Sequence, residues 1–173
     1  YNVPFILTTH GRDVYQRPFE STMRMNNTKK IFSLADRLIT VSNFTKKIMS
    51  EILSDKSRDI SVIPNGFVRK KFDKIDIDKA REMITIDSNR KVITIVGNVE
   101  KIKGHIYLIE AVRELVTDYP NILVIIIGNG PDKLMLESKV KEYGLEKNFR
   151  FEGLVPNEKL YIYLSASDLF VLP

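Results

Sequence analysis

A run of six consecutive aliphatic residues, Ile122–Ile127, constrains the fold of this chain more than any other feature of its sequence. A strand with one face in water alternates apolar and polar residues, whereas this run is apolar at every position. Lys91–Val96 and Val3–Thr9 have nearly the same character. Strands of this kind are typical of parallel sheets that are covered on both faces. We therefore predict parallel sheets with flanking helices.

Helical patterns separate the predicted strands along the whole chain. In Gly104–Thr117, for example, Ile106, Ile109, Val112 and Val116 form one apolar stripe. We expect further strands at Arg37–Val41, Ile60–Ile63, Asn121–Ile127, Phe149–Phe151 and Leu169–Leu172, and further helices at Phe19–Ala35, Asn43–Leu53, Asp76–Thr85, Lys133–Tyr143 and Asn157–Ala166. Strands that alternate with helices predict an α/β fold class.

An Asn65-Gly66 turn follows the third predicted strand. A hairpin would need a second strand directly after this turn, but the residues that follow are too highly charged for one. We therefore interpret the turn as the end of one unit. The predicted organisation is a domain over residues 1–66, a linker and first helix over 67–90, and a second domain over 91–173, with the linker itself at Phe67–Lys74.

Composition excludes several classes of site. The chain has no cysteine and only two histidines, His10 and His105, which are far apart in the sequence. Disulfides and thiolate metal sites are thus excluded, and a histidine-rich zinc site is not expected. No apolar run approaches the roughly 20 residues that span a bilayer. The aromatic residues alternate mostly with apolar rather than basic ones, which argues against nucleic-acid binding.

The charge of the chain is unevenly distributed. Residues 1–75 hold 14 Lys and Arg against 7 Asp and Glu, whereas residues 76–173 hold 13 against 15. The first part therefore has a net charge of +7 and the second of −2, which agrees with the total of +5. A basic half can face an acceptor that bears phosphate or an anionic membrane surface, although solvated helix faces would give the same pattern.

Ligands of open parallel sheets bind beyond the carboxyl ends of the strands, so the residues that follow each strand are candidates. Asn98, Lys103 and Gly104 follow the strand that ends at Val96. Free amides at the start of the next helix attract an anion, which contributes about 0.3–1 kcal/mol. A bond from Lys103 to a charged group contributes about 1.5–3 kcal/mol, so Lys103 would be the main anchor. The alternative is an ordinary surface lysine.

Glycines follow the next two predicted strands. Gly128 and Gly130 permit positive φ angles and the close approach of a ligand, and Gly153 exposes backbone that could contact a flat nucleobase. The dinucleotide-binding motif is absent, because Lys133 stands where its third glycine would be. Tight turns without a ligand are the alternative for both segments.

His10 directly follows the first strand, where it can donate a hydrogen bond to a ligand or act as a general base. A structural histidine is the alternative there, and we expect His105 to be structural or exposed to solvent. Asp76–Asp78 reads D-I-D, as in the metal sites of some nucleotide-sugar enzymes. We reject that interpretation, because the segment follows a charged stretch and either Asp76 or Asp78 suits a helix N-cap. Ser42 is likewise the predicted N-cap of the helix Asn43–Leu53.

In their order and spacing, these segments resemble the retaining nucleotide-sugar glycosyltransferases of family 4, which have the GT-B fold of two Rossmann-like domains. The matching motifs are H-G-x-D at His10–Asp13, S-x-x-T at Ser42–Thr45, I-P-N-G at Ile63–Gly66, G-N-x4-K-G at Gly97–Gly104, G-x-G-P at Gly128–Pro131, F-x-G at Phe151–Gly153 and A-S-D-x-F-V-x-P at Ala166–Pro173. Each motif is weak alone, and their common order carries the resemblance.

The resemblance implies metal-independent transfer of a sugar from a nucleotide diphosphate donor to an acceptor, with retention at the anomeric carbon. On the same ground we expect neither a metal nor a cofactor, because the nucleotide-sugar is a substrate. It implies that Asn98, Lys103 and Gly104 bind the donor diphosphate, and that catalytic His10 touches the donor sugar. The residues that it assigns to the nucleotide are Gly128, Gly130, Pro131, Leu154 and Val155. The family often has Arg where this chain has Asn98. Because Asn brings no charge, Lys103 should contribute more to diphosphate binding here.

The family has strands before the first motif and an E-x7-E element after the last one, and neither is in this chain. We therefore expect an internal fragment of a cytoplasmic transferase that can lie at the inner face of the membrane, and we expect the fragment alone to be inactive. The expected acceptor is a glycan, a lipid-linked sugar or a small molecule. Two alternatives remain: a non-catalytic nucleotide-binding or regulatory module, and a GT-B nucleotide-sugar epimerase.

Overall fold

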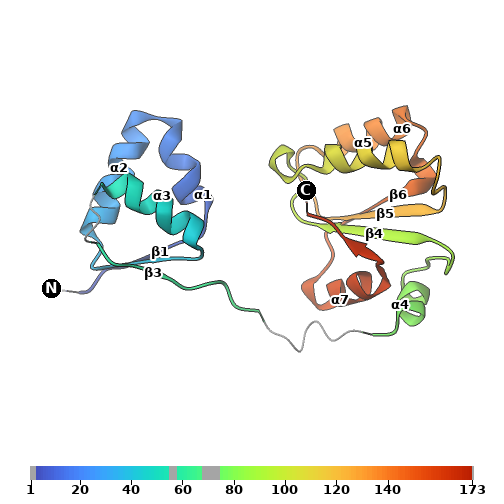
Figure 1. The fold of residues 1–173 in the computed structure, drawn as a ribbon, viewed down its shortest axis with the longest axis horizontal. Helices are drawn as coiled ribbons and strands as arrows, with labels where there is room; N and C mark the ends of the chain where they lie inside the picture. The colour runs from blue at the N-terminus through green and yellow to red at the C-terminus, as the bar shows by residue number, and fades with distance from the viewer. Residues whose placement is uncertain (1–2, 55–57, 68–74, 173) are drawn as a thin grey trace. The chain divides into compact units, whose positions relative to one another are not determined.

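The computed structural model describes residues 3–54, 58–67 and 75–172. The chain divides into two compact units, Tyr1–Phe67 and Val68–Pro173, each with its own sheet (Figure 1). Apart from Phe67, the expected linker lies outside the described residues. Residues 63–67 form no strand, and the last strand of the first unit has only a parallel neighbour within the described part. Within the described residues, nothing therefore forms the second strand that a hairpin at Asn65-Gly66 would need.

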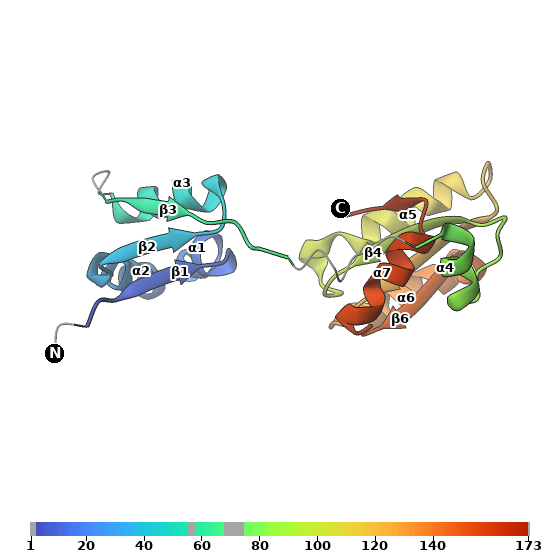
Figure 2. The same ribbon diagram turned by 90° about the horizontal axis from the view of Figure 1, so that it is seen from below.

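The first unit is a parallel sheet with helices on one face. Its strands lie in the order β1 (Ile6–Thr9), β2 (Arg37–Thr40) and β3 (Ile60–Val62). The helices are α1 (Arg12–Tyr15), a 3-10 helix (Arg17–Glu20), α2 (Thr22–Leu34) and α3 (Asn43–Leu53). All three α-helices lie on the same side of the sheet (Figures 1 and 2), where a small apolar core around Leu38, Met49 and Ile60 holds them.

The second unit is a four-stranded parallel sheet with helices on both faces. Its strands lie in the order β6 (Phe149–Gly153), β5 (Ile122–Ile127), β4 (Lys91–Val96) and β7 (Leu169–Phe170). The helices α5 (His105–Leu115) and α6 (Lys133–Glu142) cover one face, and α4 (Ile77–Met83) and α7 (Asn157–Ala166) cover the other (Figure 1). Two short 3-10 helices, Lys101–Lys103 and Glu146–Asn148, precede α5 and β6.

The alternate residues of β5 explain why this strand is aliphatic throughout. Ile122, Val124 and Ile126 belong to the core beneath α5 and α6, whereas Leu123, Ile125 and Ile127 belong to the core beneath α4 and α7. All six side chains are buried. The prediction of parallel sheets with flanking helices is thus confirmed, and both faces are covered in the second unit.

Several predicted boundaries differ from the structure for local reasons. The predicted helix Phe19–Ala35 is wrong at its start, because Pro18 lies in a separate 3-10 turn and the extended Ser21 then caps α2 by accepting from the Arg24 N–H at 3.2 Å. The short helix α1 was not predicted. The helix expected at Gly104–Thr117 begins at His105, because Gly104 adopts a left-handed conformation with φ 68°.

A buried arginine ties α4 to the strand edge of the second unit. Arg81 donates to the carbonyl oxygens of Ala166 (3.1 Å) and Ser88 (2.9 Å) and pairs with Asp168 Oδ2 at 2.8 Å. The same carboxylate oxygen accepts from the Val92 N–H at 2.7 Å. One guanidinium and one carboxylate therefore connect α4, α7, β4 and the start of β7.

We expect Arg81→Ala to lower the free energy of unfolding by about 3 kcal/mol, because it removes a buried cation and leaves its acceptors without partners. Urea unfolding measures this change. Lys133→Ala is the matched control, since the Lys133–Glu137 pair at 3.7 Å is partly exposed and should contribute below about 1 kcal/mol. Equal effects of the two substitutions would contradict the assigned role of Arg81.

Candidate active site

The loops that leave β4, β5 and β6 are joined by backbone hydrogen bonds at one edge of the second sheet. Gly97 N–H donates to the carbonyl oxygen of Ile127 at 2.9 Å, and Val99 N–H donates to that of Asn129 at 3.0 Å. Gly128 N–H in turn donates to the carbonyl oxygen of Gly153 at 2.7 Å. The carboxyl ends of these strands therefore form one continuous surface of loop backbone, where ligands of open parallel sheets bind.

Two glycines make this contact between loops possible. A Cβ atom at Gly128, where φ is 136°, would lie 1.9 Å from the carbonyl oxygen of Gly97. A Cβ atom at Gly130 would lie 2.3 Å from the carbonyl oxygen of Val99. Our sequence interpretation was that both glycines allow positive φ and admit a ligand. Only Gly128 has a positive φ, and both positions are filled by neighbouring backbone.

The residues predicted to bind a diphosphate lie together where β4 leads into α5. Asn98 Nδ2 donates to Glu100 Oε1 at 3.2 Å, so this amide is held by its own loop. Lys103 ends the 3-10 helix and is partly exposed, and its ammonium group makes no hydrogen bond or ion pair with any described residue. Gly104 is the N-cap of α5 and provides no side chain to cap it. The first amides of α5 and the Lys103 ammonium are thus available to an anion.

The residues predicted to bind the nucleotide follow β5 and β6. Pro131 is exposed beside Gly130, in the loop that leads into α6. Leu154 follows Gly153, whose φ is 70°, and its side chain is 79% exposed. Val155 differs from Leu154, because it is partly buried and packs against the core beneath α4 and α7. Leu154 can therefore offer a side chain to a ligand at this edge, whereas Val155 anchors the loop.

His10 lies in the first unit, at the carboxyl end of β1, and its side chain is exposed. Its backbone N–H donates to both carboxylate oxygens of Asp13 at 3.2 Å, and Gly11 N–H donates to Asp13 Oδ1 at 2.7 Å. Asp13 therefore fixes the turn between β1 and α1. Gly11 has φ 140°, which an L side chain rarely adopts. The turn holds His10 at the strand end without using its imidazole.

Two other sequence motifs have structural explanations. Asp76 caps α4 by accepting from the Asp78 and Lys79 N–H groups at 3.0 and 3.2 Å, as expected when the metal-binding interpretation was rejected. Ser42 caps α3 by accepting from the Thr45 N–H at 3.2 Å, and the Thr45 hydroxyl bonds to that of buried Thr40 at 2.5 Å. The predicted caps are therefore confirmed.

His105 is a residue whose position the sequence did not reveal. It is buried, 2% exposed, so the alternative that it faces solvent is wrong. Neither ring nitrogen has a hydrogen-bond partner among the described residues, and the ring borders a pocket of about 320 Å³ that Glu100, Lys101 and Asp132 also line. Burial lowers its pKa, Asp132 opposes that shift and Lys103 adds to it. His105 is therefore stabilised as the neutral imidazole, directly after the candidate diphosphate site.

We expect the protein to lose stability as the pH falls from 7.5 to 5.5, partly because of His105. Its pKa is lowered in the folded state, so the unfolded state binds the proton more readily below the ordinary pKa of about 6.5. Urea unfolding at both pH values should show a smaller loss in His105→Asn. Asp132→Asn should enlarge the loss, because Asp132 raises the pKa of His105. A loss of the same size in all three proteins would contradict this assignment.

Gly130→Ala should destabilise the second unit by about 2 kcal/mol, because the new methyl group would overlap the carbonyl oxygen of Val99 and force the two loops apart. Gly97→Ala is the matched control. A Cβ atom there meets nothing within 4 Å, so its effect should stay within about 0.5 kcal/mol. Thermal unfolding of both variants measures the difference, and equal stabilities would show that the loops do not depend on this contact.

Within the described ranges, no three His, Cys, Asp or Glu side chains gather as a metal-binding cluster would require. In that same part of the chain, no helix has the length and apolar character needed to cross a bilayer.

Two family models together match nearly the whole chain. The model for glycosyl transferases group 1 matches residues 76–173, and the model for glycosyltransferase family 4 matches residues 1–70. TuaC, the glycosyltransferase assigned to teichuronic acid biosynthesis in Bacillus subtilis, is 30% identical over 99% of this chain and 41% of its own length. Alpha-monoglucosyldiacylglycerol synthase of Acholeplasma laidlawii is 28% identical over 73% of this chain and 33% of its own.

The fold also matches that of a solved structure. Anabaena HepE in complex with UDP gives a TM-score of 0.79 at 20% identity and covers 95% of this chain and 45% of its own. This likeness, like the parallel sheets of both units, agrees with the GT-B fold inferred from the motifs. The chain spans less than half the length of these two curated relatives. It belongs to the family of glycosyl transferases group 1.

Proposed function

We propose that the protein transfers a sugar from a nucleoside diphosphate donor to an acceptor. The observation that carries the proposal is the start of α5. There the Lys103 ammonium, which has no hydrogen-bond or ion-pair partner among the described residues, stands beside a helix that no side chain caps. This arrangement suits the diphosphate of a donor, because backbone amides and an ammonium group both favour negative charge. Family membership supports the same reaction class.

The proposed chemistry follows from the charge that develops on the leaving group. As the bond from the sugar to the diphosphate breaks, negative charge grows on the diphosphate oxygens. Lys103 and the first amides of α5 would stabilise that charge, and the fixed positions of the helix amides keep the reorganisation small. Asn98 would add a hydrogen bond but no charge, because its amide is neutral. The bond to Glu100 holds this amide in place. In this scheme the leaving group is stabilised by protein groups, transfer proceeds without a metal, and the anomeric configuration is retained.

The other parts of the donor would lie along the same edge of loop backbone. The backbone at Gly128 and Gly130, together with exposed Pro131 and Leu154, is suited to a flat nucleobase. Val155 would support this surface from beneath. His10 of the first unit would contact the donor sugar, since its imidazole is exposed while its backbone is fixed by Asp13. HepE binds UDP according to its structure, which makes UDP-sugars the first donors to test.

The acceptor is proposed to be a glycan, a lipid-linked sugar or a small molecule. The synthase from Acholeplasma laidlawii is named for monoglucosyldiacylglycerol, and TuaC for teichuronic acid biosynthesis. The basic first part of this chain, with a net charge of +7, is compatible with an anionic acceptor and with a cytoplasmic protein that lies at an anionic membrane surface.

We expect Lys103→Ala, made in the full-length parent enzyme, to lower kcat/KM for sugar transfer by roughly 30-fold, which corresponds to about 2 kcal/mol of lost transition-state stabilisation. Steady-state kinetics with a panel of UDP-, GDP- and ADP-sugars gives the measurement. Lys101→Ala is the matched control, because it removes the same charge two residues away, from an exposed position. We expect it to change kcat/KM by less than about threefold.

Equal, measurable rates for the Lys103→Ala variant and the unmodified parent enzyme would place the diphosphate elsewhere and contradict the proposal. Product analysis by NMR in the same experiment reports the reaction type. Transfer with retention would show the donor's anomeric configuration in the glycosylated acceptor. Conversion of a free nucleotide-sugar into its epimer without any acceptor would instead indicate the epimerase alternative.

A further inference from the structure

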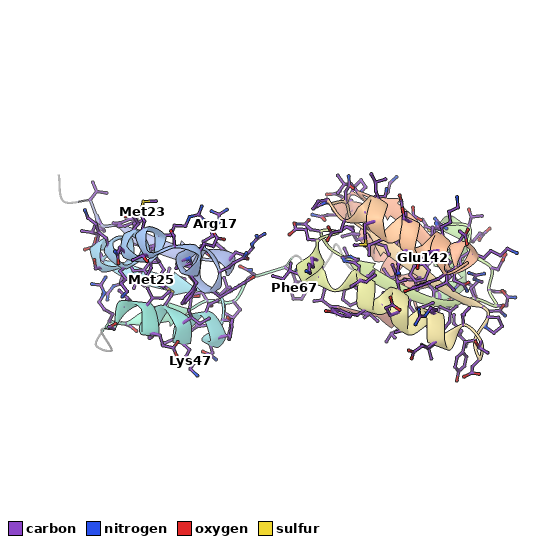
Figure 3. The ribbon with its side chains drawn as sticks, turned by 90° about the horizontal axis from the view of Figure 1, so that it is seen from above. Arg17, Met23, Met25, Lys47, Phe67 and Glu142 are labelled. Atoms are coloured by element: carbon purple, nitrogen blue, oxygen red, sulfur yellow. The ribbon has the colours of Figure 1, made fainter. Side chains whose placement is uncertain are left out.

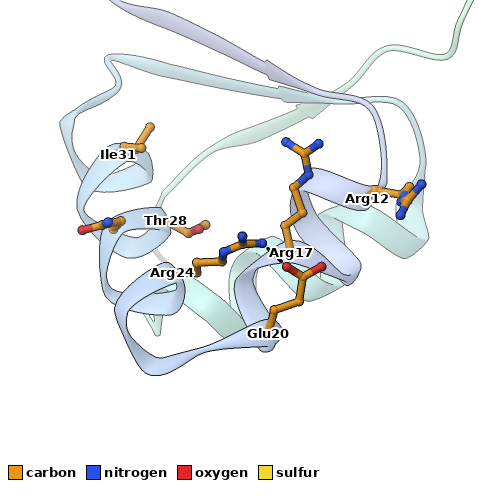
Figure 4. Close-up of a pocket in the computed structure, with 7 residues that line it drawn as sticks. Arg12, Arg17, Glu20, Arg24, Thr28 and Ile31 are labelled. Atoms are coloured by element: carbon orange, nitrogen blue, oxygen red, sulfur yellow. Dashed lines mark hydrogen bonds and ion pairs between the residues drawn. The ribbon is translucent and has the colours of Figure 1, made fainter.

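A basic groove lies between the helices of the first unit, apart from the residues discussed so far. It has a volume of about 590 Å³ and is bordered by α1, the following 3-10 helix and α2 (Figure 4). Arg12, Arg17 and Arg24 line it, together with Glu20 and the polar side chains of Asn27 and Thr28. The volume falls within the range of about 300–1,000 Å³ that is typical of small-molecule pockets.

The local sequence explains why these side chains meet. Arg24, Asn27 and Thr28 are spaced three and four residues apart, so they share one face of α2. The 3-10 turn that contains Pro18 reverses the chain before α2 and carries Arg17 and Glu20 to the opposite side of the groove. Arg17 projects from the helical layer of this unit (Figure 3).

The charges that line the groove are only partly compensated. Glu20 forms an ion pair with Arg24 across the groove (Figure 4), and Arg12 Nε donates to the amide oxygen of Gln16 at 2.9 Å. The Arg17 guanidinium makes no hydrogen bond or ion pair with any described residue. The lining therefore holds more guanidinium groups than carboxylates, and the guanidinium of Arg17 is available to a ligand.

This chemistry matches a phosphate group better than other anions. A guanidinium presents its N–H donors in a planar fork that bonds two oxygens of a phosphate at once, and several guanidiniums can share its remaining oxygens. The Asn27 amide and the Thr28 hydroxyl can supply further donors. A phosphate alone would fill only a small part of 590 Å³, so the rest of the groove has room for the group that carries the phosphate.

We propose that this arginine groove binds a phosphate group of the acceptor. The assignment rests on the proposed transferase function, in which His10 at the end of β1 contacts the donor sugar. Arg12 begins α1 only two residues after His10, so the groove and the histidine belong to the same end of the first unit. The phosphate would belong either to a soluble sugar phosphate or to a lipid headgroup. Exposed Phe19 and Met23, which flank Glu20, suit a neighbouring lipid tail.

The test compares an arginine variant with matched controls in the same unit. Arg17→Ala combined with Arg24→Ala removes two guanidiniums from the groove, and Lys47→Ala removes an exposed charge from α3, outside the groove. Glu20→Gln removes the carboxylate that competes for Arg24. Glucose 1-phosphate, measured by calorimetry, and phosphatidylglycerol vesicles, measured by co-sedimentation against phosphatidylcholine vesicles, are the two probes.

We expect the double variant to weaken binding of at least one probe tenfold or more, because two charge-assisted bonds are lost. Lys47→Ala should change binding less than twofold, and Glu20→Gln should strengthen it. An effect on glucose 1-phosphate alone supports a soluble phosphorylated acceptor, and one on the vesicles alone supports a lipid headgroup. Equal weakening by Lys47→Ala and the double variant would overturn the proposal, since binding would then follow total charge. So would the absence of binding to either probe.

Two further measurements separate this proposal from folding defects and from the proposed transferase function. Arg17→Lys combined with Arg24→Lys keeps the charge but loses the planar fork, so it should bind with intermediate affinity, and its unfolding curve should match that of the unmodified protein. UDP-sugar binding should be unchanged in the double alanine variant. Failure of UDP-sugar binding in the unmodified protein would count against the donor site, whereas unchanged phosphate binding in the variant would count only against the groove.

Discussion

The backbone contact between the loops after β4 and β5 is the constraint on which the candidate donor site depends. Gly128 and Gly130 lie so close to the carbonyl oxygens of Gly97 and Val99 that a side chain at either position would overlap them. This contact holds the start of α5 beside the loop that leads to α6. A phosphate site made of helix amides and a base site made of loop backbone can therefore share one edge of the sheet.

The two units offer anion sites of different chemistry. In the second unit, the attraction comes from the amides of α5 and a single lysine, which suits charge that grows on a leaving diphosphate. In the first unit it comes from guanidinium groups around an open groove, which suits a phosphate that stays bound and orients its carrier. If both proposals hold, the second unit binds the donor diphosphate, where negative charge develops during the reaction. The first unit binds a phosphate that only positions the acceptor.

The fold could be predicted from the sequence because its strongest signals are local. Six aliphatic residues in β5 require apolar cores on both faces, and Ser42 and Asp76 cap helices through bonds to amides two or three residues away. The roles that depend on contacts distant in sequence were not predicted. Gly130 looked like a site of ligand approach because nothing in the sequence reveals that Val99 occupies the space.

Buried polar residues were equally hidden from sequence reasoning. His105 follows a lysine and a glycine at a helix start, a position usually open to water, and only the packing of α5 near Asp132 buries it. Arg81 reads as one more charge on a short amphipathic helix, yet it bonds to residues more than 80 positions later in the chain. The arginine groove was represented in the sequence only as an excess of positive charge in the first part.

The most direct test of the central claim is an NMR titration of the protein with UDP, GDP and ADP, followed through its assigned backbone amides. We predict that one of these nucleotides shifts the amides of His105 and Ile106 at the start of α5 together with those of Gly128, Gly130 and Leu154, because diphosphate and base would contact the same edge. Shifts confined to other parts of the second unit, or no shifts with any of the three nucleotides at millimolar concentration, would contradict a donor site at the loops after β4, β5 and β6.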